Sequence, residues 1–362
     1  MLTYEIPLVP GPTSVPQAVR EAYFCDFGSG DMEEECFRLY AGLEAKLRQI
    51  LKTRNTIAVM TGEGMLALWA AMKSCLRPGD RVLSVATGPF GHSIAEMAKG
   101  LGAKVRVMGF GEDEVADPDA VARVIATYRP RMLTAVHCET PAGTLNPVAE
   151  LGAAGKRYGV ELFYVDAVAS AAGAPLDVDG WGIDLALVGS QKCLSGLPDL
   201  AMVAISDAAW AAIESLDYAG YDALKPWRRV AETKYFPYTP SWHALTAIDR
   251  ACAIVLEEGM DAVIRRHDEA ARLCRRRAQE LGLKLYPRRE AFCSPTVTAL
   301  RVPEGLPWHE LDRRLRARGM AVGGSWEKLA GRVFRIGHMG NQARVELVAR
   351  GMDALADALK NP

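Results

Sequence analysis

Between about residues 56 and 206, short apolar runs alternate with longer runs of helical spacing, and this alternation limits the possible fold more than any other feature. The predicted strands are Thr56–Val59, Arg81–Ala86, Lys104–Met108, Met132–Val136, Leu162–Val165, Leu185–Gly189 and Ala201–Ile205. The predicted helices between them include Met65–Cys75, Ser93–Leu101, Asp117–Thr127 and Pro147–Tyr158. Apolar strands separated by helices indicate an α/β fold whose seven-stranded, mostly parallel sheet is covered on both faces. Such sheets bind ligands beyond the carboxyl ends of their strands.

After about residue 250 the pattern changes, which predicts a smaller α+β domain. Its expected elements are helices Met260–Leu281, Trp308–Arg318 and Ala343–Leu359 and strands Lys284–Tyr286, Thr296–Arg301 and Val333–Ile336. The segment Ile6–Pro16 is rich in proline and is expected to be an extended arm. The predicted division is an arm at 1–16, a large domain at 17–250 and a small domain at 251–362.

Composition favours a small-molecule partner. The 362 residues carry 43 Lys and Arg against 44 Asp and Glu, a formal charge of −1. That balance offers no electrostatic footprint for nucleic acid or for an anionic membrane surface. No run reaches the roughly 18 apolar residues of a membrane span. We therefore expect no nucleic-acid or membrane partner.

The cysteines and the first residues indicate a cytoplasmic protein. Eight scattered cysteines without a Cys-x-x-Cys pair are typical of reduced thiols in a reducing compartment. The first 25 residues contain one basic residue, Arg20, which suits neither a signal peptide nor a transit peptide. No cluster has the spacing of metal ligands, so no metal is expected.

Two strand-end residues indicate pyridoxal chemistry. Asp166 directly follows a predicted apolar strand, and Lys192 lies just past another one, 26 residues later. A lysine at the end of a core strand is costly unless it is paired or used covalently. Pyridoxal chemistry needs an amine to form an imine with the aldehyde and an acid to keep the pyridine nitrogen protonated. Either residue alone could be a solvated loop residue, whereas the pair favours the cofactor site.

Four motifs in order then make a family resemblance visible. They are His137-Cys138-Glu139-Thr140-Pro141-Ala142-Gly143, Val165-Asp166-Ala167-Val168, Ser190-Gln191-Lys192 and Tyr235-Phe236-Pro237-Tyr238-Thr239-Pro240. The sequence resembles the class V aminotransferases of fold type I, pyridoxal-phosphate enzymes, and among them the serine–glyoxylate, alanine–glyoxylate and pyridoxamine–pyruvate aminotransferases. The resemblance runs from Pro10 to Gly340, nearly the whole chain.

The resemblance implies a role for each matching residue. Lys192 matches the Schiff-base lysine that also moves the substrate Cα proton, and Asp166 matches the partner of the pyridine nitrogen. Arg335 falls where the family binds the substrate carboxylate, and a guanidinium meets a carboxylate through two parallel hydrogen bonds. Gly11 is expected to bring a backbone N–H near the same carboxylate. The remaining cofactor contacts implied are Phe90 and Val168 on the two ring faces, Thr140 near the phenolic oxygen, and Gln191, Tyr235 and Tyr238 at the phosphate, with the tyrosines coming from the other subunit of a homodimer.

The turn Gly62-Glu63-Gly64 departs from the pattern. A glycine-rich turn into a helix N-terminus is a natural phosphate cradle, and the resemblance places the cofactor phosphate there. Relatives mostly carry a small hydroxyl residue at position 63. A carboxylate about 4 Å from a phosphate costs about 4 kcal/mol per charge pair at an effective dielectric of 20. Glu63 therefore caps the helix and points away, is neutralised, or faces a ring that lacks the phosphate.

We expect a ping-pong transaminase that uses pyridoxal 5'-phosphate with alanine or serine as donor and glyoxylate or pyruvate as acceptor. A pyridoxamine–pyruvate aminotransferase acting on unphosphorylated vitamers is the alternative. That group resembles this chain and carries a glutamate in the turn, although Trp326 stands where it has a second arginine. A cysteine desulfurase would need Cys293 as a mobile nucleophile, and a binding protein without enzymatic activity would form no imine with Lys192.

Overall fold

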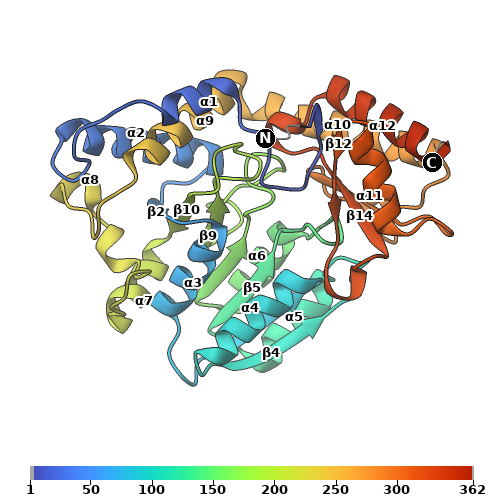
Figure 1. Cartoon of the computed structure of the whole chain (residues 1–362). Coiled ribbons are helices and arrows are strands. Elements are labelled where there is room, and N and C mark those ends of the chain that lie inside the picture. The colour runs from blue at the N-terminus through green and yellow to red at the C-terminus, as the bar shows by residue number, and fades with distance from the viewer. Residues whose placement is uncertain (1–3, 361–362) are drawn as a thin grey trace.

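The computed structural model describes residues 4–360 (Figure 1). Residues 1–3 of the predicted arm and residues 361–362 of the predicted small domain lie outside the described residues. No helix within residues 4–360 combines the length and the apolar character that a membrane span requires.

A seven-stranded sheet forms the centre of the molecule, as predicted. Its spatial order is β2-β10-β9-β8-β5-β3-β4. The strands are β2 (Thr56–Thr61), β3 (Arg81–Ala86), β4 (Lys104–Gly109), β5 (Met132–Val136), β8 (Leu162–Asp166), β9 (Leu185–Gly189) and β10 (Leu200–Ile205). All pairings are parallel except those of β10, which is antiparallel to both β2 and β9. The connection from β9 to β10 is too short for a crossover helix, so β10 must run back along β9.

Helices cover both faces of this sheet. The predicted helices are confirmed as α3 (Gly64–Cys75), α4 (Pro89–Gly100), α5 (Pro118–Tyr128) and α6 (Val148–Arg157). Helices α3 and α4 contact each other, as do α5 and α6. Crossovers between parallel strands are right-handed. Because the strand order reverses after β4, the two helix pairs lie on opposite faces.

Further helices were absent from the sequence predictions. They are α1 (Gln17–Tyr23), α2 (Glu34–Leu51), α7 (Asp207–Leu216), α8 (Val230–Thr233) and α9 (Trp242–Glu258). Helices α1, α2 and α9 pack together beside the β2 edge of the sheet (Figure 1). Short 3-10 turns also occur, at η1 (Lys225–Trp227), η2 (Glu290–Phe292), η3 (Glu327–Leu329) and η4 (Gly340–Gln342).

The C-terminal part is α+β, as predicted. Its sheet has the order β11 (Val297–Arg301), β14 (Val333–Gly337) and β13 (Gly323–Gly324), and its helices are α10 (Met260–Glu280), α11 (Trp308–Ala317) and α12 (Val345–Lys360). The predicted strand Lys284–Tyr286 is wrong, because it forms only one isolated bridge, between Leu285 and Leu300. Pro287 follows directly, and proline has no N–H to continue the pairing.

The predicted arm is extended but is tied down. Strand β1 (Ile6–Pro7) pairs in parallel with β12 (Met320–Ala321), and Leu8 is fully buried. Ile6 and Leu8 belong to a hydrophobic core that otherwise consists of C-terminal residues. The arm is therefore part of the C-terminal packing.

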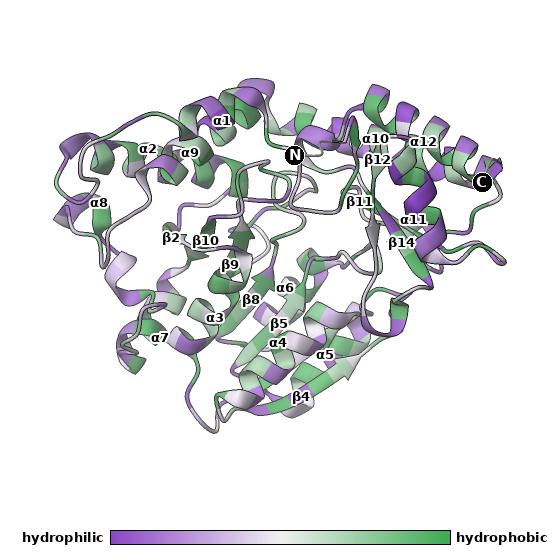
Figure 2. Cartoon of the chain, in the orientation of Figure 1, coloured by the Kyte–Doolittle hydropathy of each residue, from purple (hydrophilic) through white to green (hydrophobic). Residues whose placement is uncertain are grey.

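Two large hydrophobic cores are present, one around the seven-stranded sheet and one around β11 and β14. In Figure 2 the strands of the large sheet are mostly apolar, whereas α11 and α12 alternate between apolar and polar residues. The predicted boundary at residues 250–251 falls inside α9, and Gly259 separates α9 from α10. The domain division stays a prediction.

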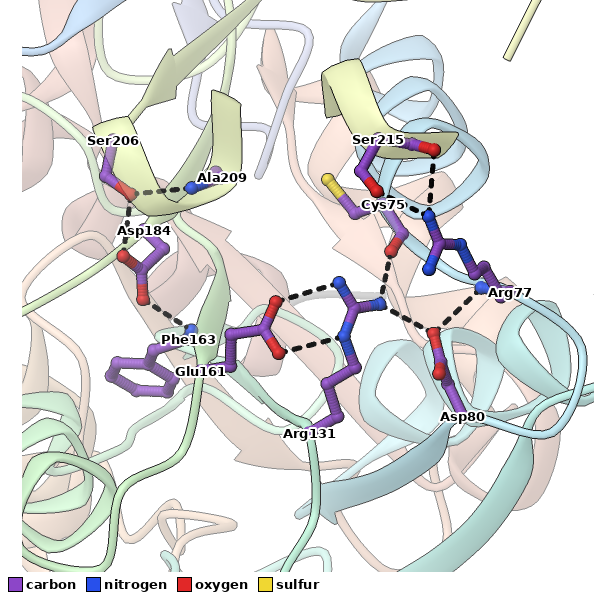
Figure 3. Close-up of polar contacts among 10 residues, drawn as sticks. All are labelled: Cys75, Arg77, Asp80, Arg131, Glu161, Phe163, Asp184, Ser206, Ala209 and Ser215. Carbon is purple, nitrogen blue, oxygen red and sulfur yellow. Dashed lines mark hydrogen bonds and ion pairs between the residues drawn. The ribbon is translucent and has the colours of Figure 1, made fainter. Parts of the chain in front are cut away.

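At the amino ends of the parallel strands, Arg131 forms the centre of a polar network (Figure 3). Its guanidinium donates to both carboxylate oxygens of Glu161, at 2.9 and 3.0 Å. It also donates to Asp80 Oδ2 at 2.6 Å and to the carbonyl of Cys75 at 2.8 Å. The network therefore joins the starts of β3, β5 and β8 to the end of α3.

A second contact set lies beside it. Asp184 precedes β9 and accepts from the Phe163 N–H at 2.8 Å and from Ser206 Oγ at 2.6 Å (Figure 3). These bonds hold together the end of the sheet at which the parallel strands begin, opposite to their carboxyl ends.

Candidate active site

A cavity of about 190 Å³ lies at the carboxyl ends of the parallel strands. It is lined by Glu63, Gly64, Met65, Leu68, Phe90, Cys138, Thr140, Asp166, Val168, Ala169, Gln191 and Lys192. Larger surface hollows exist elsewhere, but this cavity is lined by both an amine, Lys192, and a buried carboxylate, Asp166, as a cofactor site requires. Of the residues predicted from the sequence, Gly11, Gly62, Arg335, Tyr235 and Tyr238 are not among those lining the cavity.

Lys192 lies three residues past β9, and its amine donates to the carbonyl of Pro10 at 2.8 Å. Burial, with a smaller contribution from Arg335, lowers the pKa of this amine. A lowered pKa increases the fraction of unprotonated, nucleophilic amine at neutral pH. The arm also holds the lysine backbone, because Thr13 Oγ1 donates to the Lys192 carbonyl at 3.0 Å.

Asp166 is the last residue of β8 and is only 6 % exposed. One of its oxygens accepts from the Val168 N–H at 2.9 Å. Burial raises the pKa of Asp166 to about 6, although the Val168 N–H and Lys192 oppose the shift. Within residues 4–360 this carboxylate has no ion-pair partner at salt-bridge distance. A buried carboxylate is costly unless a cation pairs with it, and a protonated ring nitrogen would be such a cation.

Phe90 is half-buried at the N-terminus of α4, and a buried glutamate holds this end of the helix. Glu139 accepts from the Gly91 N–H at 2.7 Å and from the Phe90 N–H at 3.4 Å. Glu139 is completely buried, and burial raises its pKa to about 8. Thr140 follows directly and is buried at the cavity. Sequence reasoning gave Glu139 no role, although its position in the motif beside Thr140 was a usable signal.

The glycine-rich turn caps α3 with Glu63. Its Oε1 accepts from the Met65 N–H at 3.0 Å, and its Oε2 accepts from Gln191 Nε2 at 3.2 Å. Gly62 has φ of 148°, and a Cβ at Gly64 would lie 3.0 Å from a methyl group of Val168. The Met65 N–H and the Gln191 amide are donors that could bind an anion, and both donate instead to the Glu63 carboxylate.

Arg335 lies in β14 and is 3 % exposed. Its Nε and Nη2 donate to the Gly324 carbonyl, at 2.8 and 2.5 Å. Burial lowers its pKa to about 10, so the guanidinium stays charged at neutral pH. Within the described part of the chain no carboxylate forms an ion pair with it. A buried cation without an acid partner suits the binding of a carboxylate from outside.

Gly11 lies against the lysine. It has φ of 96°, and a Cβ there would lie 2.4 Å from Lys192 Nζ. Only glycine permits this approach of the arm to the amine.

The two tyrosines differ in exposure. Tyr235 is 63 % exposed. Tyr238 stacks on Tyr221 with ring centroids 4.4 Å apart. Within residues 4–360 the buried Tyr238 hydroxyl makes no hydrogen bond of normal geometry. Burial raises the pKa of Tyr238, and the nearby Thr61 backbone opposes this shift. Thr61 begins the glycine-rich turn of the same chain, and the contact across two subunits stays a prediction.

The cysteine desulfurase alternative receives no support from the geometry. Cys293 does not line the cavity, and burial raises the pKa of its thiol to about 11, which keeps it protonated. In residues 4–360 no group of three or more His, Cys, Asp or Glu is arranged to hold a metal ion.

The comparisons with known proteins agree with this geometry. A family model described as aminotransferase class-V matches residues 12–328. An alanine–glyoxylate aminotransferase of Callithrix jacchus is 32 % identical over 98 % of this chain and 87 % of the relative. A pyridoxamine–pyruvate transaminase of Mesorhizobium japonicum is 31 % identical over 89 % of this chain and 83 % of the relative. A crystal structure of pyridoxamine–pyruvate aminotransferase from Mesorhizobium loti has a TM-score of 0.96 at 28 % identity, covering 99 % of this chain and 93 % of that one.

Proposed function

The chain belongs to the class V aminotransferase family, and on this basis we propose that it moves an amino group from alanine or serine to glyoxylate or pyruvate. Class V aminotransferases depend on pyridoxal phosphate, and the chain is a transaminase. The observation that carries the proposal is that the Lys192 amine and the buried Asp166 carboxylate line one cavity.

The proposed roles follow from the chemistry of the side chains. When bound, pyridoxal phosphate supplies an electron sink for the charge left on the substrate Cα. The Lys192 amine would hold the cofactor at its aldehyde carbon, and its lowered pKa suits it to take up and return the substrate Cα proton. Asp166 holds a proton on the ring nitrogen, and Arg335 fixes the substrate carboxylate. The amino donor leaves as an oxo acid before the acceptor binds, so the same residues serve both half-reactions.

Borohydride reduction tests the role of Lys192 directly. The protein loaded with pyridoxal phosphate is expected to absorb near 410–420 nm, about what a protonated imine shows. Reduction should fix the cofactor mass on the peptide that contains Lys192. Lys192→Ala should remove both signals, whereas Lys328→Ala, at an exposed lysine, should keep them. Labelling of another lysine, or no label in the wild-type protein, would refute the proposal.

A second candidate is a pyridoxamine–pyruvate aminotransferase that uses the vitamer without phosphate. The observation that favours it is the Glu63 carboxylate, which holds the Met65 N–H and the Gln191 amide where a phosphate would bind. Relatives of that name are also similar in sequence and structure.

Titration with pyridoxal phosphate and with pyridoxal separates the two candidates. Two unit charges about 4 Å apart interact by about 1 kcal/mol in water and about 4 kcal/mol at a dielectric of 20. Glu63 is exposed, so Glu63→Ser should tighten the phosphorylated form about fivefold to tenfold and leave pyridoxal unchanged. Glu63→Gln removes the charge with little change in shape and should act in the same direction. Equal changes for both vitamers would show that Glu63 does not repel phosphate.

We also propose a cytoplasmic homodimer. Tyr235 lies in the segment predicted to reach a second subunit, and Tyr221 stacks on Tyr238 of the same segment. Both Tyr221 and Tyr235 are exposed, and burial of such rings stabilises an interface. All eight cysteines are free, as in a reducing compartment. Sedimentation analysis that gives one chain per particle would contradict the dimer.

A further inference from the structure

The indole of Trp326 links two predicted site residues. It lies over the guanidinium of Arg335, with 4.6 Å between Cζ and the ring centroid. It also meets the ring of Phe90 edge-on, with centroids 5.8 Å apart at 81°. On the basis of the proposed function, we propose that Trp326 positions Arg335 for the substrate carboxylate and forms the wall that limits the substrate side chain. The preferred substrates are then monocarboxylic amino acids with small side chains.

The loop that carries Trp326 is anchored on both sides. Ser325 Oγ donates to the Pro141 carbonyl at 2.9 Å, and the Ser325 N–H donates to the Val333 carbonyl at 3.1 Å. After the tryptophan, the N–H of buried Leu329 donates to the Trp326 carbonyl at 2.9 Å. These contacts hold the indole in place relative to β14 and to the motif that contains Thr140.

Two glycines let the segment before Trp326 pack closely, Gly323 against Pro10 and Arg335 and Gly324 against Trp308. A Cβ at Gly323 would lie 2.8 Å from Pro10 Cδ and 3.2 Å from Arg335 Nη2. A Cβ at Gly324 would lie 2.7 Å from Trp308 Nε1. Without these side chains, the Gly324 carbonyl reaches both Nε and Nη2 of the guanidinium.

The arrangement leaves one part of the guanidinium for a ligand. The indole covers one face and the Gly324 carbonyl takes one edge. Among residues 4–360 no other hydrogen-bond or ion-pair partner takes Nη1 or the second hydrogen of Nη2. A carboxylate can meet these two donors through parallel hydrogen bonds. The indole face also attracts the cation and limits its contact with water, which strengthens its attraction for an anion.

The same ring restricts the space beside the substrate. A substrate with its carboxylate at Arg335 and its Cα at the cavity has Trp326 alongside, because the indole contacts both Arg335 and Phe90. Trp326 is 46 % exposed in the single chain, so much of the indole is free to contact a ligand. A bulky substrate side chain would have to displace this anchored ring.

The test uses the cofactor-loaded protein and two acids that cannot react, propionate and 4-methylpentanoate, measured by calorimetry. Trp326→Leu keeps bulk without an aromatic face and should bind propionate about tenfold more weakly. Trp326→Phe should restore binding to within about twofold of wild type. Trp326→Ala should raise the affinity for 4-methylpentanoate relative to propionate about tenfold by opening the wall.

Kinetics with alanine and leucine provide the second readout. In Trp326→Leu the KM for alanine should rise about tenfold while kcat changes by less than about twofold, because the lost contact serves binding. Trp69→Leu is a matched control, since Trp69 also carries a cation over its ring, Lys73 at 5.6 Å, but does not line the cavity. It should leave both acids unaffected.

The proposal is overturned if Trp326→Leu binds propionate like wild type, or if Trp326→Ala keeps the wild-type ratio of the two acids. In either case, cofactor mass on the Lys192 peptide after borohydride reduction would still support the transaminase function. If the cofactor-loaded wild-type protein binds neither acid, both the proposed role of Trp326 and the assignment of Arg335 to the substrate carboxylate are wrong.

Discussion

At the residue scale, the proposed role of Asp166 predicts that its charge controls the affinity for the cofactor. Burial raises its pKa to about 6, so in the empty protein the carboxyl is protonated below that pH. The folded state then holds the proton more tightly than the unfolded state, and this residue's contribution to stability is lost as pH rises from about 4 to about 6. In the proposed complex a cationic ring nitrogen would reverse the balance, because it would pair with the anion.

Cofactor affinity should therefore fall about tenfold per pH unit below pH 6 and level off above it. Asp166→Asn should remove this pH dependence and weaken binding at pH 8 about tenfold to a hundredfold, the range expected for a lost charged hydrogen bond. Fluorescence titration from pH 5 to 8 measures both effects. Asp184→Asn, at the opposite edge of the sheet, should keep the wild-type profile. A sloping profile in Asp166→Asn would assign the titration to another group.

At the scale of elements, the Arg131 network stabilises the amino ends of three strands. Arg131→Ala removes one cation and leaves Asp80 and Glu161 without their partner. We expect the free energy of unfolding to fall by about 2–4 kcal/mol. Urea denaturation measures the change. Arg54→Ala is the control, since its ion pair with Asp179 at 3.4 Å is exposed and is worth about 0.5 kcal/mol. Equal losses in the two variants would show that the network does not stabilise the sheet.

Sequence patterns predicted the strands of the large sheet well and long-range contacts poorly. Apolar runs bounded by turns identify a strand such as β5 (Met132–Val136), because burial on both faces leaves a local signature. Helix α2 (Glu34–Leu51) was missed because its buried face becomes meaningful only once α9 is known to cover it. The antiparallel direction of β10 likewise depends on the geometry of one short loop.

The candidate site shows the same division. Asp166 and Lys192 were predictable because Asp166 ends one apolar strand and Lys192 lies three residues past another. The contacts of the Lys192 amine with Pro10 and of Trp326 with Arg335 and Phe90 join segments far apart in the chain. Spacing alone carries no information about such pairs, so Trp326 was noted only as the place where related enzymes have an arginine.

At the scale of the whole molecule, the arm connects the C-terminal core to the lysine. Leu8 is fully buried, and its Cδ1 would lie 2.4 Å from a Cβ at Gly351 of α12. Leu8→Ala should lower the free energy of unfolding by about 2–5 kcal/mol and weaken cofactor binding, because the same segment carries Pro10. Thermal melts with and without cofactor measure both. Val345→Ala, at a position 38 % exposed, should change stability by less than about 0.5 kcal/mol. If Leu8→Ala melts like this control, the arm is dispensable.

The hydrogen bonds of the arm have a consequence for synthesis on the ribosome. The N–H of Leu8 donates to the carbonyl of Ala321, the N–H of Gly337 donates to the carbonyl of Leu8, and Gln342 Nε2 donates to the carbonyl of Val9. Residues 6–9 are thus translated some 300 residues before their partners. Until residue 342 has emerged, the segment that carries Pro10 lacks these partners, so we expect a nascent or truncated chain to leave the Lys192 amine uncovered.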